Sequence, residues 1–254
     1  MILHYLAIDT VCAVLAWTLL AGKLCEGWIG ILPLAWTGAG VWLIYTADRW
    51  LDSFPGSREK NPGARHRFVG HHRRAVGFLW IFIWLLALGS GLIFLNGISL
   101  LLGSAVVAIA VAYLWLMQKK PPDSGTDKIG SGGGWMVGLS VASAVLLFPI
   151  LSGEASGSEK FFVWLTVGWI FSFQTRATRS WESGKRIHRG KLALFAAPPV
   201  IMALFVHELV PLAGAGLLLF IGILVVERLP ISDRVAAADW TLALSGGLSY
   251  LLVF

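Results

Sequence analysis

Charge is scarce in this chain, and acidic charge is scarcer than basic charge. Only 13% of the 254 residues are Asp, Glu, Lys or Arg, against about 25% in soluble globular domains. Hydrophobic residues make up 57% of the sequence, and the mean hydropathy is +0.75. This balance excludes an ordinary soluble domain. It predicts an all-α, polytopic membrane bundle that forms a single transmembrane domain over residues 1–254.

Cysteine is almost absent as well. The chain has only Cys12 and Cys25, and their spacing matches no metal-binding or redox motif, so we interpret them as small apolar or interfacial residues. The N-terminus lacks the basic region and the small-residue cleavage site of a signal peptide. The first apolar segment is therefore expected to be retained as a membrane helix.

Long apolar runs, by contrast, recur along the whole sequence. A helix needs about 20 mainly apolar residues to span a bilayer, and runs of about 17 still suffice. The pattern predicts about nine transmembrane helices. The segments are residues 3–22, 28–46, 76–95, 97–117, 134–151, 161–175, 191–206, 209–226 and 239–254.

Basic residues predict the orientation of these segments. With a cytoplasmic N-terminus, 18 of the 20 Lys and Arg residues fall in the inside connections, and only Lys23 and Lys160 fall outside. Most of the inside charge lies in residues 47–75 and 176–191, which we interpret as the functional cytoplasmic loops. The net charge of +6 then follows from loop orientation and contact with anionic lipid, without nucleic acid.

A pair of aspartates, Asp48 and Asp52, ends the second apolar segment. Residues four apart share a helix face, so the two carboxylates are expected on one side of the helix, at the membrane edge. A helix C-terminus disfavours anions by roughly 0.3–1 kcal/mol each, so a cation should compensate. One interpretation is Mg²⁺, which prefers carboxylates, waters and substrate phosphates. The other is ion pairing with Arg49 or a loop arginine.

Together, these features resemble the UbiA-type intramembrane prenyltransferases. The first motif of that family reads N-D-x-x-D-x-x-x-D, and residues 44–52 read I-Y-T-A-D-R-W-L-D, so only the last two aspartates match. The Arg-rich stretch that often follows, ending in R-P, resembles residues 65–68 (R-H-R-F). The tyrosine followed by paired basic residues at the end of the fourth helix resembles Tyr113 with Lys119 and Lys120. The resemblance covers most of the chain as topology but only three short stretches as motif.

The second motif of that family, D-x-x-x-D after the sixth helix, is missing here. No Asp occurs between Lys128 and Ser232, and Trp181 and Lys185 stand where the aspartates are expected. Glu182 is the acid available in this connection. One Mg²⁺ together with Arg and Lys donors could still neutralise a diphosphate, because guanidinium groups bind phosphate bidentately.

The resemblance implies transfer of a prenyl group from a prenyl diphosphate to a lipophilic acceptor, within a bacterial plasma (inner) membrane. It assigns Asp48 and Asp52 to Mg²⁺ binding and catalysis, with Glu182 as a further catalytic acid. Diphosphate binding is assigned to Arg49, Arg65, Arg67, Tyr113, Lys119, Arg179, Lys185 and Arg186. The alternative for each basic residue is a solvated positive-inside charge.

Two other functions remain open. One is a catalytically silent relative that binds a polyprenyl or lipid phosphate, and the other is a small membrane transporter. Asp9 lies in the first apolar segment, where an ionisable group is either functional or interfacial. Trp17, Trp42 and Trp84 lie deeper in their segments and either line a prenyl pocket or pack in the core.

Overall fold

The computed structural model describes residues 6–52, 64–118, 132–182, 198–199, 201 and 210–253. In these ranges the chain is all-helical and contains no strand. Its helices are α2 (Ile8–Leu24), α3 (Ile31–Asp52), α4 (Ala64–His71), α5 (Arg73–Phe94), α6 (Gly97–Gln118), α7 (Gly132–Ser152), α8 (Gly157–Glu182), α10 (Val210–Val226) and α11 (Ile231–Leu252). Eight of the predicted apolar segments coincide with these helices. The seventh, residues 191–206, lies mostly outside the described ranges.

Several helices are longer than their apolar segments. α3 continues from residue 46 to Asp52, α8 continues from residue 175 to Glu182, and α11 begins at Ile231 instead of residue 239. Hydropathy marks only the part of a helix that lipid surrounds, whereas backbone hydrogen bonding continues through polar residues. The basic stretch expected as a loop also contains the short helix α4.

Within the described ranges, three helices are long and apolar enough to cross a membrane: Arg73–Phe94 in α5, Gly97–Trp115 in α6 and Asp233–Leu252 in α11. Shorter apolar stretches occur in α7 and α10. Large hydrophobic side chains are exposed along the outer faces of these helices, including Phe78 and Ile93 on α5 and Leu248 on α11. Such surfaces indicate a membrane protein, because a soluble monomer rarely exposes apolar area on this scale.

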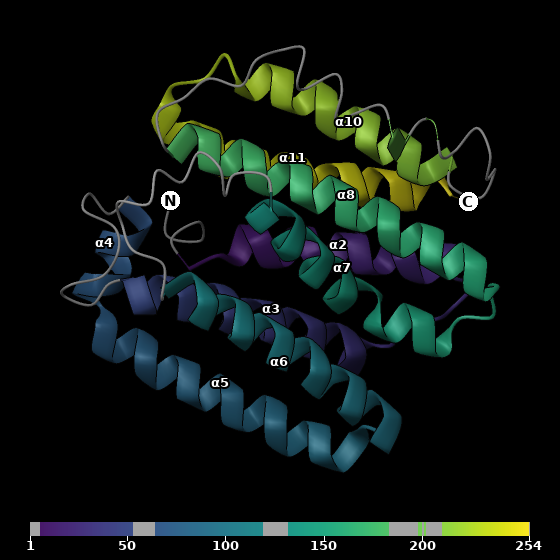
Figure 1. Cartoon of the computed structure of the whole chain (residues 1–254), viewed down its shortest axis with the longest axis horizontal. Helices are drawn as coiled ribbons and strands as arrows, with labels where there is room; N and C mark the ends of the chain where they lie inside the picture. The colour runs from purple at the N-terminus through teal and green to yellow at the C-terminus, as the bar shows by residue number, and fades with distance from the viewer. Residues whose placement is uncertain are drawn as a thin grey trace.

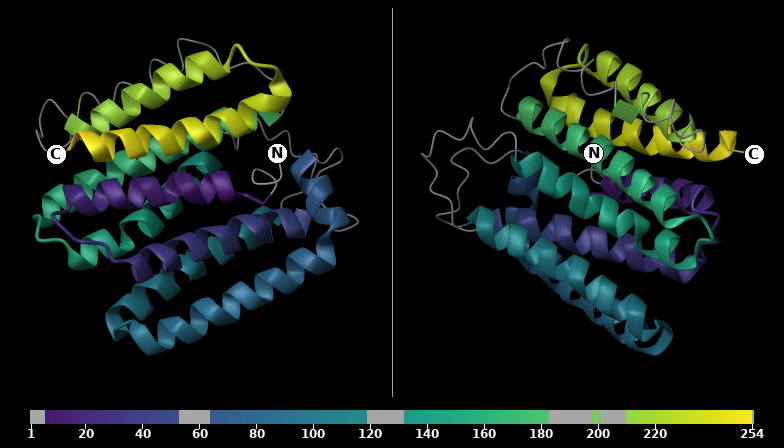
Figure 2. Two further views of the ribbon diagram at one scale, coloured as in Figure 1. Left: turned by 180° about the vertical axis from the view of Figure 1, so that it is seen from behind. Right: turned by 45° about the vertical axis from the view of Figure 1, so that its right-hand side comes forward.

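The helices form three layers, which Figures 1 and 2 show from different sides. α10 and α11 lie on one flank, α3, α5 and α6 lie on the other, and α2, α7 and α8 lie between them (Figure 1). α7 packs on α2, α3, α6 and α8, and α2 packs on α3, α7 and α11. The hydrophobic core follows these central helices, with Trp17, Leu146 and Val167 fully buried.

Tryptophan side chains join neighbouring helices by hydrogen bonds. Trp17 Nε1 donates to Leu242 O at 2.9 Å, which ties α2 to α11. Trp164 Nε1 donates to Ser143 Oγ at 3.1 Å, which ties α8 to α7. A buried indole N–H needs an acceptor, so these bonds satisfy the donor and fix the helix pairs. Trp17 therefore packs in the core, which is one of the two roles that the sequence predicts for it.

The α7–α8 pair packs most closely at Gly138. A β-carbon at this position would collide with Ser172 Oγ and Ser172 N and would lie 2.5 Å from Gly168 O. Two of these three atoms belong to the backbone of α8, so the neighbouring helix cannot yield by a side-chain rotation. Small residues allow membrane helices to approach in this way.

One end of the bundle gathers the helix termini that the sequence assigned to the cytoplasm. Figure 1 shows the ends of α3 and α8, together with the beginnings of α5 and α11, at this same end. The alternating helix directions agree with the predicted connections. The cytoplasmic orientation and the nine-helix count stay predictions.

Candidate functional site

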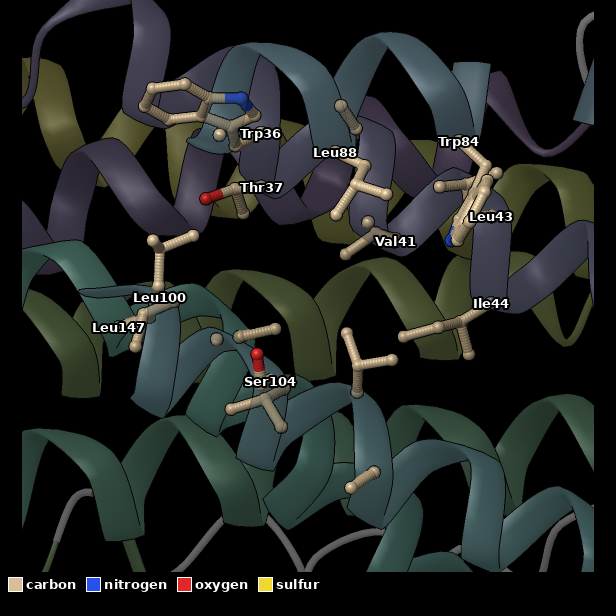
Figure 3. Close-up of a pocket in the computed structure, with 18 of the residues that line it drawn as sticks. Trp36, Thr37, Val41, Leu43, Ile44, Trp84, Leu88, Leu100, Ser104 and Leu147 are labelled. Carbon is tan, nitrogen blue, oxygen red and sulfur yellow. The ribbon is translucent and has the colours of Figure 1, made fainter. Parts of the chain in front are cut away.

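A cavity of about 590 Å³ lies between α3, α5, α6 and α7. Its volume falls within the range of about 300–1,000 Å³ that small-molecule sites occupy. Figure 3 shows Val41, Leu88 and Ser104 directed into this space from three different helices. The residues that line it are Trp36, Thr37, Gly40, Val41, Leu43, Ile44, Ala47, Trp80, Trp84, Ala87, Leu88, Gly91, Leu95, Ser99, Leu100, Gly103, Ser104, Val106, Val107, Ala108, Val111, Leu114, Ala144, Leu147 and Phe148.

Small residues on α6 create much of this room. Gly103, Ser104 and Ala108 lie on the α6 face that looks into the cavity, where larger side chains would fill it. α5 packs on α3, and α6 packs on α7 and α3, so that the two helices diverge from their common turn around the cavity. The space therefore results from helix packing and not from a missing side chain.

Polar groups in the cavity wall are largely satisfied within the protein. Trp36 Nε1 donates to Ser90 Oγ at 3.0 Å, Trp80 Nε1 donates to Leu43 O at 2.9 Å, and Thr37 Oγ1 donates to Pro33 O at 3.0 Å. The wall consequently offers aromatic faces and aliphatic groups to a ligand. This arrangement suits an apolar chain, because a polar ligand would find few partners there.

Asp48 lies at one end of the cavity. Ala47 is the last α3 residue in the wall, and Asp48 follows four residues after the wall residue Ile44, on the same face of α3. The Asp48 side chain is half-buried. Asp52, four residues further, is the last residue of α3, and its side chain lies outside the described part of the chain. From Trp36 to Ala47 the wall follows α3 for about 16 Å, at 1.5 Å per residue. An elongated apolar space thus leads to an acidic helix end.

Arg49 points away from the cavity. It is 5% exposed, does not line the cavity, and its guanidinium carbon lies 5.9 Å from the centroid of the Tyr45 ring. This distance allows a cation–π interaction within the bundle. The structure therefore places Arg49 apart from the cavity wall, and its assignment to diphosphate binding stays a prediction.

Basic residues beyond the first acidic motif do lie beside the end of α3. The short helix α4 packs on α3, and Trp50 Nε1 donates to the carbonyl oxygen of Arg73 at 3.3 Å. Arg67 is exposed on α4, while only the backbone of Arg65 is described. His71 and His72 are exposed, and their rings meet edge to face with centroids 4.9 Å apart. α4 thus brings cationic groups to the helix end that carries Asp48.

The remaining predicted site residues lie on α6, on α8 or outside the described ranges. Tyr113 is half-buried on α6, next to the wall residue Leu114. Glu182 is the last residue of α8, and Arg179 lies one turn before it, but neither side chain is described. Lys119, Lys185 and Arg186 lie outside the described residues. Among the described members of this group, Tyr113 is therefore the residue that lies close to the cavity.

α8 lies apart from the acidic end of α3. α8 packs on α7, α10 and α11, whereas α3 packs on α2, α5, α6 and α7 as well as on α4. The expected convergence of Asp48, Asp52 and Glu182 around one cavity stays a prediction, because two of these side chains are not described.

Trp181 has a structural partner. It is fully buried and donates through Nε1 to Glu227 Oε1, while Arg234 Nη1 lies 3.3 Å from Glu227 Oε2. The Arg234 Nε atom also donates to Leu229 O at 2.9 Å. This group fixes the end of α8 to the turn between α10 and α11. Trp181 is thus a buried indole that cannot contact a phosphate in solvent.

Further polar residues are buried near the same end. Asp9 on α2 is fully buried inside the bundle. Gln174 Nε2 lies 3.5 Å from Asp239 Oδ1, and both residues are buried. Burial also lowers the pKa of the Arg176 guanidinium from its ordinary value. The sequence reasoning overlooked Asp239, although an acid at the start of an apolar run was a usable signal.

The donor set at the end of α3 suits a hard divalent cation. Two carboxylates one helical turn apart in the sequence match the preference of Mg²⁺ for carboxylate oxygens. Among the residues whose placement is described, no group of three or more His, Cys, Asp or Glu residues is positioned to hold a metal ion. Asp48 and Asp52 would therefore hold such an ion together with a phosphate ligand.

Comparisons of the chain with protein-family models, with curated proteins and with solved structures found no match.

Proposed function

We propose that this protein binds a prenyl diphosphate in the membrane and acts as a UbiA-like prenyltransferase. The observation that carries this proposal is the elongated apolar cavity along α3, whose wall ends at Ala47, directly before Asp48. The isoprenoid chain would occupy the cavity, and the diphosphate would lie at the end of α3. A nine-helix bundle with a cytoplasmic N-terminus, in a bacterial plasma membrane, is part of the same proposal.

The charged groups near the acidic end suit the leaving group of such a reaction. Mg²⁺ held by Asp48 and Asp52 would neutralise the charge that develops on the departing diphosphate. Exposed basic residues on α4, such as Arg67, would contact its remaining oxygens. Trp80 lies in the wall beside α3, where its ring would stabilise a developing allylic cation by a cation–π interaction.

The lipophilic acceptor would meet the allylic carbon inside the cavity. The bond from that carbon to the diphosphate oxygen breaks, the acceptor forms the new bond, and the acceptor proton passes to a base or to water. The apolar wall would keep water away from the cation until the acceptor attacks.

A silent relative that only binds the lipid phosphate is the second candidate. It is favoured by the buried Trp181, which replaces an expected phosphate-side carboxylate. Release of diphosphate from a panel of prenyl diphosphates, measured with and without Mg²⁺, separates the two functions. Mg²⁺-dependent release supports the transferase, and tight binding without release supports the silent relative.

Filling the cavity is expected to weaken binding of the prenyl chain. Gly40 lines the cavity, and a β-carbon added there would meet no atom within 4 Å, so the Gly40→Leu side chain starts in open space. We expect the affinity for a prenyl diphosphate to fall by about tenfold, or about 1.4 kcal/mol. Isothermal titration in detergent or nanodiscs measures this change.

Gly89→Leu is the matched control. Gly89 lies on α5, also has open space around its β-position, and does not line the cavity. This variant should bind the prenyl diphosphate as the wild-type protein does. Equal losses in the two variants, or no loss in Gly40→Leu, would show that the ligand does not occupy this cavity.

A further inference from the structure

Exposed basic side chains gather where α4 meets α5, at the end of the bundle where α3 ends (Figure 1). Within residues 64–75 the sequence contains no Asp or Glu. The basic side chains that the structure shows exposed here are Arg67, His71, His72, Arg73 and Arg74. The surface of this junction therefore carries a net positive charge.

The two arginines that begin α5 belong to different faces of the helix. Arg73 precedes the cavity-wall residues Trp80 and Trp84 by seven and eleven residues, so it lies on the cavity side. Arg74 precedes Phe78 and Phe82 by four and eight residues, and these rings are 75% and 51% exposed. Arg74 therefore continues the exposed apolar face of α5, one turn beyond its aromatic rings.

Packing and backbone hydrogen bonds hold the junction in place. Val69 and Val76 are buried, one on each side of it. His72 N donates to Phe68 O, and Val76 N donates to His72 O, both at 3.0 Å, so helical hydrogen bonding continues from α4 into α5. The exposed basic side chains are therefore presented from a folded surface and not from a loose loop.

The level of Arg74 in the membrane follows from α5 itself. This helix contains a stretch long and apolar enough to cross a membrane, of which only 11% is buried inside the protein. Phe78 is the first large apolar side chain exposed on α5, and Arg74 precedes it by about 6 Å along the axis, at 1.5 Å per residue. A guanidinium one turn beyond lipid-facing rings reaches the headgroup region, where the lipid phosphates lie.

We propose that the α4–α5 junction binds an anionic phospholipid, whose headgroup contacts Arg74 and His71 and whose acyl chain lies along Phe78 and Phe82. The Arg74 guanidinium binds phosphate oxygens bidentately, and the exposed His71 ring, three residues earlier, offers a further N–H donor. The exposed rings supply apolar surface to the acyl chain. This site is separate from the cavity and does not depend on the proposed function.

Native mass spectrometry of the purified protein tests this site. Phosphatidylglycerol and phosphatidylcholine with the same acyl chains are titrated separately, so that the comparison isolates the headgroup. We expect the wild type to prefer phosphatidylglycerol by about tenfold. Arg74→Gln should lose about fivefold of this affinity, the usual effect of one basic residue near an anionic membrane surface. Adding His71→Gln should remove most of the remaining preference, while phosphatidylcholine binding should stay unchanged in both variants.

Arg228→Gln is the matched control. Arg228 is exposed in the turn between α10 and α11, at the same end of the bundle, and its loss changes the net charge equally. This variant should bind both lipids as the wild type does. Equal losses in Arg74→Gln and Arg228→Gln, no loss in Arg74→Gln, or no preference in the wild type would overturn the lipid site.

A titration with prenyl diphosphate separates the lipid headgroup from the other source of phosphate. Arg74→Gln should bind prenyl diphosphate as the wild type does. A loss of that affinity with unchanged lipid binding would assign Arg74 to the diphosphate and overturn the lipid site. Failure of the wild type to bind prenyl diphosphate would refute the proposed function and leave the lipid site to be decided by the lipid titrations.

Discussion

Asp48→Asn is expected to lower Mg²⁺-dependent release of diphosphate by about 100-fold, the loss typical of removing one group that stabilises developing charge. The substitution keeps the size of the side chain and removes its charge at the acidic end of the cavity. If the protein only binds its ligand, the same change should appear as a loss of Mg²⁺-dependent affinity for prenyl diphosphate. A phosphate-release assay and a binding titration on one preparation measure both quantities.

Asp233→Asn provides the matched control for this experiment. Asp233 is an exposed acid in the first turn of α11, at the same end of the bundle, so its loss changes the net charge equally. We expect no change in release or in affinity for this variant. If Asp48→Asn and Asp233→Asn behave alike, Asp48 does not hold the ligand, and ion pairing becomes its better explanation.

Gly138→Ala is expected to destabilise the fold by about 3 kcal/mol, at the upper end of the usual cost of overpacking. The added methyl group would collide with the backbone of α8 at Ser172, where no side-chain movement can relieve it. The α7–α8 pair would have to separate, and it forms the central layer of the bundle. Unfolding by SDS in mixed micelles measures the change in the free energy of unfolding.

Gly89→Ala makes the same substitution where the β-position is open. Alanine is favoured over glycine in a helix by about 1 kcal/mol, so this variant should be as stable as the wild type or slightly more stable. Similar stabilities for the two alanine variants would contradict the close approach of α7 and α8.

The helical layout could be predicted from the sequence because it follows from the lengths of apolar runs. Eight apolar segments coincide with helices in the structure. The ends of the helices could not be predicted in this way. Residues 176–182, for example, include two arginines and a glutamate and are too polar to count as membrane-embedded, yet they continue α8.

The cavity itself could not be predicted from the sequence. Trp84 was one of three tryptophans considered for a pocket, and it does line the cavity, but Trp17 and Trp42 are buried in the core, where each donates to a backbone carbonyl. Trp36 and Trp80, which do line the cavity, were not singled out. A helical pattern shows that a residue is apolar, whereas the neighbouring helix decides whether it meets a side chain or open space.

The central claim, that an isoprenoid chain occupies the cavity with its phosphate at Asp48, is tested most directly by photolabelling. A prenyl diphosphate with a diazirine near the end of its chain is irradiated with the protein in nanodiscs, and the labelled residues are identified by mass spectrometry. We predict labels on wall residues distant from Asp48, such as Trp36, Leu100 and Phe148, and competition by the unlabelled diphosphate. Labels confined to the outer faces of α5 and α11, unaffected by competition, would contradict the account.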